Sequence, residues 1–218
     1  MSEPAPKGKC TRRRIRDTLV ARILDGTYPT GTRLKELTLA REFGVSQAPI
    51  REALRELEGS GLVASERYRG TRVRGADYRE LRESYDLRLI MEERALELAA
   101  PFSAELIEDL AGRVHAMATA AEAKDTERYI DEALGFHRRL VEASGNRTFL
   151  MVWDFQHWDV RGRIALRRRI ASPEGGGLKP MVDLHRSLSA RIRAGDVHGA
   201  ADKVAAIFRR ITAALDAT

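Results

Sequence analysis

Residues 39–55 read LAREFGVSQAPIREALR, and this stretch decides how the first third of the chain folds. A short helix with an apolar inner side ends at Gly44, a residue that often terminates helices. The next helix starts almost at once, because Ser46 is a good N-cap and Pro49 falls in the first turn, where its missing N–H costs nothing. The spacing therefore predicts two helices joined by a tight connection.

The second of these helices has two distinct faces. Its apolar residues recur at the spacing of one inward stripe, which consists of Ile50, Ala53, Leu54 and Leu57. Its opposite face is polar and consists of Gln47, Arg51, Arg55 and Glu58. The polar face is therefore free to meet a partner while the apolar face holds the helix in the core.

Three further segments complete this part of the chain. Apolar residues at helical spacing predict a helix from Thr11 to about Asp25. After the two central helices the period changes to that of strands, which predicts strands at 62–65 and 71–74. A basic hairpin tip at 66–70 joins them. Three helices followed by a two-stranded hairpin predict a winged helix-turn-helix over residues 11–75, in which the second central helix enters the DNA major groove.

Charge is distributed unevenly along the 218 residues. The net charge is +6, and residues 1–75 hold 16 Lys and Arg against 9 Asp and Glu. Residues 76–218 hold 22 against 23. An asymmetric basic segment favours a polyanion partner. Aromatic residues make up only 6% of the chain, which argues against a surface that stacks single-stranded bases.

The remainder of the chain predicts an all-α bundle, so the fold class is mainly α. Residues 1–10 are expected to be a disordered lead-in, and residues 77–218 a second domain. Breakers separate the helices that we predict at 77–100, 103–123, 126–144, 147–171, 178–194 and 197–216. The predicted helix 147–171 carries a group of aromatic residues. Its arginines are expected to form a solvated helix face. These arginines are Arg161, Arg163, Arg167, Arg168 and Arg169.

The first domain resembles the GntR family of bacterial transcription regulators. The matching pieces are YPTGTRL at 28–34, the opening stretch 39–55, Gly61-Leu62-Val63, and RGTRV at 69–73, which is similar to the family's wing tip. The resemblance implies that Arg51 and residues 46–48 contact operator DNA, and that Gly70 lets the wing approach the minor groove. Many members have Arg where this chain has Gln47, a difference that should alter base preference.

The expected DNA contacts follow from the geometry of a recognition helix together with this resemblance. Side chains of the first turn reach base edges, where Gln pairs with adenine and Arg with guanine. Arginines further along reach phosphates, which position the protein without specifying sequence. The residues expected at the DNA are Lys35, Arg41, Ser46, Gln47, Ala48, Arg51, Arg55, Arg69, Gly70 and Thr71.

The second domain resembles the FCD effector domain of the FadR subgroup. The matching pieces are DLRLIME at 86–92, FHRRLVEASGN at 136–146, LHRSL at 184–188 and RAGD at 193–196. The resemblance implies an antiparallel helical bundle with a central cavity. It also implies a divalent metal ion held by one Asp and three His, which helps to bind a small carboxylic acid.

The metal ligands are only half present in this chain. His137 and His185 occupy two of the four ligand positions, whereas Ala133 and Ile207 occupy the others. Two imidazoles alone make a weak site for most divalent metals. A metal therefore requires replacement ligands, for which the sequence offers Asp131, Glu132 or His157.

The favoured interpretation is a metal-free pocket that binds an acidic ligand directly. His137, His185 and Arg88 are its expected effector-binding residues, because a planar guanidinium pairs well with a carboxylate. Two alternatives stay open. The histidines fit a packed core equally well, and Arg88 can form a salt bridge with Glu92 one helical turn away.

Together these observations predict a ligand-responsive transcription regulator, expected to be a repressor, that reads a palindromic operator as a homodimer. The alternatives are a metal-dependent enzyme acting on a small acid and a sequence-neutral DNA-binding protein. No nucleophile–base pair, phosphate-binding glycine loop or H-E-x-x-H motif supports the enzyme. The single cysteine, Cys10, fits the cytoplasm, and no apolar run approaches the ~18 residues of a membrane helix.

Overall fold

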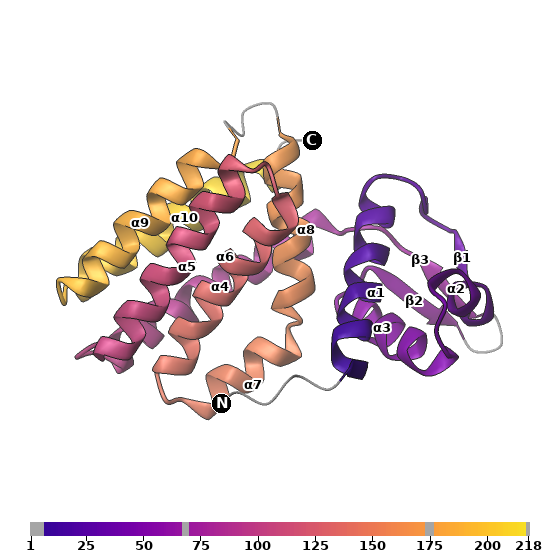
Figure 1. The fold of residues 1–218 in the computed structure, drawn as a ribbon, viewed down its shortest axis with the longest axis horizontal. Helices are drawn as coiled ribbons and strands as arrows, with labels where there is room; N and C mark the ends of the chain where they lie inside the picture. The colour runs from indigo at the N-terminus through magenta and orange to yellow at the C-terminus, as the bar shows by residue number, and fades with distance from the viewer. Residues whose placement is uncertain (1–6, 67–69, 173–176, 217–218) are drawn as a thin grey trace. The chain divides into compact units, whose positions relative to one another are not determined.

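The computed structural model describes residues 7–66, 70–172 and 177–216. Their contacts divide the chain into two compact units, with the division between Asp77 and Tyr78. Figure 1 labels the helices and strands of both units.

The first unit is a winged helix-turn-helix, as predicted. Its elements are α1 (Lys7–Leu24), β1 (Arg33–Leu34), α2 (Glu36–Phe43), α3 (Gln47–Gly59), β2 (Val63–Glu66) and β3 (Gly70–Val73). Helix α1 begins at Lys7 and so extends four residues further toward the N-terminus than the helix predicted from Thr11. The expected disordered lead-in therefore overlaps the first turn of α1.

The sheet of this unit has a third strand that the sequence does not reveal. The strands are ordered β1-β3-β2, and both pairings are antiparallel. Arg33 lies opposite Arg72, and Leu34 lies opposite Thr71. A strand of two residues is too short to show the alternation that marks a strand, so only its partner reveals it.

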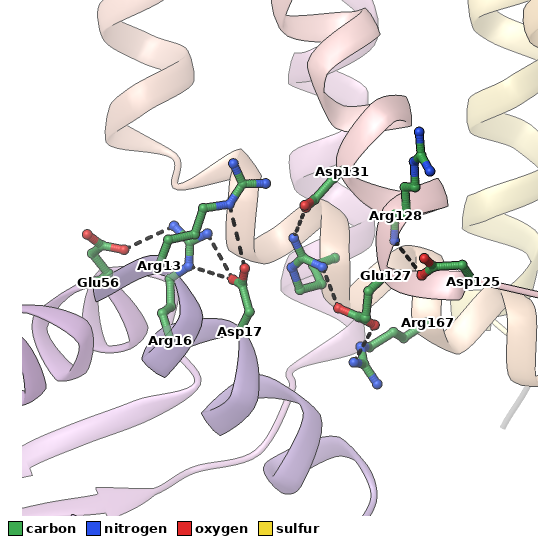
Figure 2. Close-up of polar contacts among 10 residues, drawn as sticks. Arg13, Arg16, Asp17, Glu56, Asp125, Glu127, Arg128, Asp131 and Arg167 are labelled. Carbon is green, nitrogen blue, oxygen red and sulfur yellow. Dashed lines mark hydrogen bonds and ion pairs between the residues drawn. The ribbon is translucent and has the colours of Figure 1, made fainter. Parts of the chain in front are cut away.

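The core of the first unit lies between α1 and α3. Ile15 and Leu19 of α1 and Ile50 and Leu57 of α3 are all fully buried. These are the inward positions that the apolar spacing predicts. At the edge of this core Arg16 is also buried, and it reaches both Asp17 and Glu56, as Figure 2 shows.

The second unit is the predicted all-α bundle. Its elements are α4 (Tyr78–Ala99), α5 (Ala104–Glu122), α6 (Thr126–Ala143), α7 (Arg147–Phe155), α8 (Trp158–Ala171), α9 (Lys179–Arg193) and α10 (Val197–Asp216). Helix α5 packs against α6 and α9, and α10 packs against α4, α8 and α9 (Figure 1). Within the described part of the chain, no helix combines the length and apolarity that crossing a membrane requires.

The single helix predicted over 147–171 is wrong. It is divided into α7 and α8 at Gln156 and His157, and His157 has a positive φ of 50°. Helix α7 therefore ends with Phe155, and α8 starts afresh at Trp158. Neither breaking residue is Gly or Pro, so the sequence carries no ordinary signal for this interruption.

The solvated arginine face predicted on the same segment is also wrong. Arg161, Arg163 and Arg169 are buried. Arg161 donates to Glu80 at 2.6 Å, and Arg163 donates to Glu127 at 2.7 Å. Helix α8 packs against α6 and α10. Carboxylates on other helices neutralise Arg161 and Arg163, which periodicity along α8 alone does not show.

Candidate DNA-binding surface and effector site

The first turn of α3 is an exposed polar surface on a buried support. Ser46, Gln47, Ala48 and Arg51 are all exposed, as is Arg55 one turn further along. Ser46 occupies the N-cap position with an extended backbone, but its side chain makes no capping hydrogen bond. The hydroxyl is therefore not committed to holding the helix.

Helix α2 lies before this surface and adds two exposed cations. Lys35 occupies its N-cap position and Arg41 lies in its last turn. Gly44, with φ of 64°, closes the helix in the left-handed conformation. That conformation suits glycine and allows α3 to start within three residues.

Arg51 is held by a carboxylate that the sequence analysis missed. Its Nη2 donates to Glu36 Oε2 at 2.8 Å, and its Nε lies 3.2 Å from both carboxylate oxygens. Glu36 is the first residue of α2. The two residues are 15 positions apart and on different helices, so no local spacing links them. The pair fixes the orientation of the guanidinium, and hydrogen bonding to Glu36 raises the pKa of Arg51.

The wing is the hairpin of β2 and β3, and its second strand, β3, begins at Gly70, whose φ is 80°. A Cβ placed there would lie 3.3 Å from Nε of Arg33, so the arginine side chain of β1 lies close against the wing backbone. Thr71 follows, and its hydroxyl lies 3.1 Å from that of Ser65. Arg33 was not among the expected DNA residues, because only the unpredicted pairing of β1 brings it here. Arg69 lies outside the described residues.

The second unit contains a buried chain of charged groups. Arg88 is 1% exposed and Glu92 is fully buried. Arg88 Nε donates to Glu92 Oε1 at 2.6 Å, and Glu92 Oε2 lies 2.5 Å from His137 Nδ1. The salt bridge that the sequence analysis kept open for Arg88 is thus present. Burial alone would raise the pKa of Glu92, but His137 and Arg88 hold it below its ordinary value.

Four aromatic rings surround the Arg88 guanidinium. Its central carbon lies 4.7–4.8 Å from the ring centres of Trp153, Trp158 and Phe208, and 5.5 Å from that of Tyr85. Burial raises the pKa of Tyr85 to about 12, so this phenol keeps its proton. Three buried donors in the cluster have no hydrogen-bond partner, namely Arg88 Nη2, Tyr85 Oη and Trp158 Nε1. The cluster therefore offers donors to an acceptor.

The two histidines lie side by side at the end of this chain. Their ring centres are 5.3 Å apart. His185 Nδ1 donates to the Met181 carbonyl at 2.7 Å, and its buried Nε2 has no partner. Burial lowers the pKa of His137, and burial together with His137 lowers the pKa of His185 to about 3. Both rings are therefore neutral at pH 7.

These residues do not fit the four-ligand metal site that the FCD resemblance implies. Ala133 and Ile207 are buried at the other two ligand positions. Of the replacement ligands suggested by sequence, Asp131 pairs with Arg163 and Glu132 pairs with Arg113. His157 lies at the break between α7 and α8. Over residues 7–66, 70–172 and 177–216, no three His, Cys, Asp or Glu side chains are placed to share a metal ion.

Comparisons with known proteins identify both units. A winged helix-turn-helix joined to a separate helical bundle defines a DNA-binding regulator with a sensing domain. The model described as "Bacterial regulatory proteins, gntR family" matches residues 11–73, and the "FCD domain" model matches residues 83–210. The chain belongs to the GntR family of bacterial transcription regulators and carries an FCD domain. Members with this architecture regulate transcription and are not enzymes, which answers the enzyme alternative.

Several curated relatives are named as repressors. A probable D-xylose utilization operon transcriptional repressor of Paenarthrobacter nicotinovorans is 32% identical over 84% of this chain and 78% of its own length. A gluconate operon transcriptional repressor of Bacillus licheniformis is 35% identical over 65% of this chain and 58% of its own length. The chain thus spans somewhat under three fifths of the second relative. As a member of the same family, this chain is a DNA-binding transcription regulator.

Solved structures share the fold. Escherichia coli McbR/YncC matches with a TM-score of 0.73 and 23% identity, over 94% of this chain and 96% of that one. A GntR transcriptional regulator from Rhodococcus sp. RHA1 matches with a TM-score of 0.71 and 21% identity, over 94% of this chain and 96% of that one. At this identity the likeness establishes the fold of the chain.

Proposed function

We propose that this regulator is a repressor that reads a palindromic operator as a homodimer, through the exposed first turn of α3, and that a small carboxylic acid bound in the FCD domain controls it. The observation that carries the DNA-binding part is the orientation of α3. Its apolar stripe is buried, and its polar first turn is exposed. The protein would act in the cytoplasm, where its operator lies.

Within this surface, Gln47 and Arg51 would read the bases, and the flanking cations would position the protein on the DNA backbone. A side-chain amide can make paired hydrogen bonds to adenine, and a guanidinium can do so to guanine. Lys35, Arg41 and Arg55 would contact phosphates, and Gly70 and Thr71 would bring the wing to the backbone. The remaining alternative, a sequence-neutral DNA-binding protein, needs no base contacts.

The deciding experiment measures binding of Arg51→Ala to operator DNA and to random DNA at physiological salt. We expect operator affinity to fall about 10- to 100-fold, because a bidentate base contact contributes about 1–3 kcal/mol. Affinity for random DNA should change little. Arg14→Ala is the matched control, since it removes the same charge from an exposed position on α1. An unchanged operator-to-random ratio in Arg51→Ala would show that α3 does not read bases.

The effector proposal rests on the donors around Arg88. Arg88 Nη2, Tyr85 Oη and Trp158 Nε1 are buried and lack acceptors, and a carboxylate supplies acceptor oxygens. The His185 Nε2 atom, which carries no proton when Nδ1 donates to Met181, would accept from a hydroxyl of the same ligand. Glu92 already balances the charge of Arg88, so binding would rest on hydrogen bonds to these donors, and the acid should also offer hydroxyl groups.

Gluconate is the first acid to test, because two relatives are named for a gluconate operon. D-Xylose, which the first relative's name mentions, has hydroxyl groups but no carboxylate and is the matched probe. Calorimetric titration of the whole protein should show binding of gluconate and weaker or no binding of D-xylose. The variant His185→Gln should weaken gluconate binding. Stronger binding of D-xylose would refute an acid-specific site.

The homodimer is supported by an exposed apolar face on α4. Leu87, Ile90 and Leu98 are exposed there, and Ile90 is 66% exposed. A two-fold axis between residues 88 and 89 of two antiparallel copies of α4 would place Leu87 against the partner's Ile90. The same register would place the acidic Glu83 opposite the partner's basic Arg94. Such a self-complementary face suits a second copy of this chain, and two-fold symmetry suits a palindromic operator.

A further inference from the structure

The FCD domain contains a cavity that is separate from the cluster around Arg88. Its volume is about 620 Å³, within the range of roughly 300–1,000 Å³ that is typical of small-molecule sites. The last turns of α5, the turn that leads into α6 and the first two turns of α9 line it. Among the described residues that line it, none belongs to the Arg88 cluster, and neither His137 nor His185 is present.

The floor of this cavity is apolar. Ala118 and Ala121 of α5 are half-buried, as is Leu178, which lies immediately before α9. Val182 of α9 is 4% exposed. The floor is stable because α5 and α9 pack against each other along the bundle (Figure 1). An apolar group that covers it would remove apolar surface from water, which stabilises a complex.

The rim of the cavity is charged, with more cations than anions. Lys124, Lys179 and Arg186 are exposed there, together with Glu122 and Asp183. Arg186 donates to Asp183 at 2.6 Å, so these two charges balance each other. The ammonium groups of Lys124 and Lys179 make no ion pair with any described residue. Two lysines therefore stand against one glutamate, and the rim favours an anion.

The backbone of Lys124 is in a conformation that suits glycine better than lysine. Its φ is 55°, in the left-handed region. It follows the end of α5, where the Asp125 N–H donates to the Ala120 carbonyl at 2.8 Å. Glycine is the usual residue at this point of a helix end, because a Cβ makes the left-handed conformation costly. A side chain kept at such a cost indicates a role for that side chain.

Lys179 is also unfavourably placed for a residue that serves only stability. It is the first residue of α9, and no side chain caps this end of the helix. A helix N-terminus carries partial positive charge, which disfavours a cation beside it. The start of α6 is different, because Asp125 accepts from the Arg128 N–H at 3.0 Å, as Figure 2 shows. An anion in the cavity would reduce the cost of placing Lys179 at its helix end.

We propose that this cavity binds a small acid with an apolar body. The anionic group pairs with Lys124 and Lys179 at the rim, and the apolar body covers Ala121 and Val182 on the floor. A sugar acid such as gluconate has no apolar surface and does not suit this floor. The cavity uses none of the residues assigned to DNA or to the Arg88 cluster, so it is independent of both parts of the proposed function.

The test is calorimetric titration of the whole protein with cinnamate and with cinnamyl alcohol at neutral pH. The two probes share one aromatic body, and only cinnamate is charged. We expect cinnamate to bind about 2- to 25-fold more tightly than the alcohol, because each of two exposed ion pairs contributes up to about 5-fold. Equal binding of the two probes, or binding of neither, would overturn the proposal.

Lys124→Gly separates ligand binding from stability. Affinity for cinnamate should fall about 2- to 5-fold, and affinity for cinnamyl alcohol should not change. Tm should stay the same or rise, because glycine adopts the left-handed conformation without strain. Lys203→Ala is the matched control, since it removes the same charge from α10 at a position that does not line the cavity. It should leave the binding of both probes unchanged.

The double variant Lys124→Gly with Lys179→Ala should bind cinnamate no more tightly than cinnamyl alcohol. Its affinity for gluconate should equal that of the wild type, so failure of this site and failure of the Arg88 site are read separately. Val182→Thr keeps the shape of the floor but adds a hydroxyl, and it should weaken both probes to the same extent. Wild-type affinity for cinnamate in the double variant, or unchanged binding of both probes in Val182→Thr, would refute the assignment.

Discussion

At the scale of single residues, the Glu36–Arg51 pair bears most directly on the proposed reading of DNA. The carboxylate holds the guanidinium through contacts to both Nε and Nη2, which leaves its remaining N–H groups to face outward. A side chain fixed before binding loses less conformational freedom when it meets a base. The same carboxylate repels phosphates, so it should lower affinity for DNA in general while sharpening the choice of sequence.

This interpretation predicts opposite effects of Glu36→Gln on two kinds of DNA. Operator affinity should fall about 3- to 10-fold, or roughly 0.7–1.4 kcal/mol, as Arg51 loses its charged anchor. The loss is smaller than the roughly 1.5–3 kcal/mol of a hydrogen bond to a charged group, because the substituted glutamine can still accept a hydrogen bond. Affinity for random DNA should rise, because one negative charge near the phosphates is removed. Fluorescence anisotropy with both DNAs measures the ratio. Equal changes for the two DNAs would assign Glu36 a purely electrostatic role.

The neutral histidines predict how stability depends on pH. The pKa values of His137 and His185 are lowered in the folded protein, whereas unfolded histidine titrates near about 6.5. Below that pH the unfolded chain binds protons that the folded chain does not. The free energy of unfolding should therefore fall from pH 7.5 to 5.5, by up to about 1.4 kcal/mol per pH unit for each histidine.

Urea unfolding followed by tryptophan fluorescence measures this slope for the FCD domain. His185→Gln removes one of the two groups and should make the slope shallower. Glu92 does not confuse the result, because its lowered pKa contributes stability that is lost only below the ordinary titration of a glutamate, near about pH 4.5. A stability that stays flat from pH 7.5 to 5.5 would contradict the neutral, buried assignment.

At the scale of elements, the sequence predicts the features that depend on the local spacing of apolar residues. The stripe from Ile50 to Leu57 defines α3 and the direction of its polar face, and the same reasoning defines most helices of the bundle. Local spacing does not predict features that depend on contacts between distant segments. Strand β1 exists only because β3 lies beside it, and Glu36 meets Arg51 only because α2 packs on α3.

The candidate sites divide in the same way. His137 and His185 could be placed together because the family resemblance relates their helices, and the structure brings them within 5.3 Å. The ring cage around Arg88 could not be predicted. It depends on which side chains four separate helices bring to one point, and spacing within one helix carries no such information.

The break between α7 and α8 leads to a prediction at this scale. His157 adopts a left-handed backbone conformation, which β-branched residues strongly disfavour. His157→Val should lower the free energy of unfolding by about 1–2 kcal/mol. Gln156→Val is the matched control, because Gln156 has an ordinary φ of −74° and should tolerate the change. Equal losses in the two variants would place the cost in lost side-chain contacts instead.

At the scale of the whole molecule, the proposed dimer links operator symmetry to the α4 face. Ile90→Asp places a charge where the proposed interface is apolar, and desolvating an unpaired carboxylate is costly. We expect this variant to be monomeric at micromolar concentration and to bind the palindromic operator at least about 10-fold more weakly. Light scattering after size-exclusion chromatography measures the mass.

Met151→Asp is the control for this experiment, because Met151 is a comparably exposed apolar residue on α7. It should leave the mass of a dimer unchanged. The charge pair offers a second check. Glu83→Arg and Arg94→Glu should each weaken the dimer, and the double variant should restore it. If Ile90→Asp remains dimeric, the interface lies elsewhere, whereas the reading of DNA by α3 is unaffected.

The order of strands in the first unit has a consequence for the chain as it is synthesised. β3 lies between β1 and β2, yet it follows both in the sequence. The growing chain therefore carries two strands that have no partner until β3, which ends at residue 73, has left the ribosome. A ribosome stalled earlier would expose the helices without a wing. Folding of the DNA-binding unit is thus timed by its last segment, just before the helices of the sensor begin to emerge.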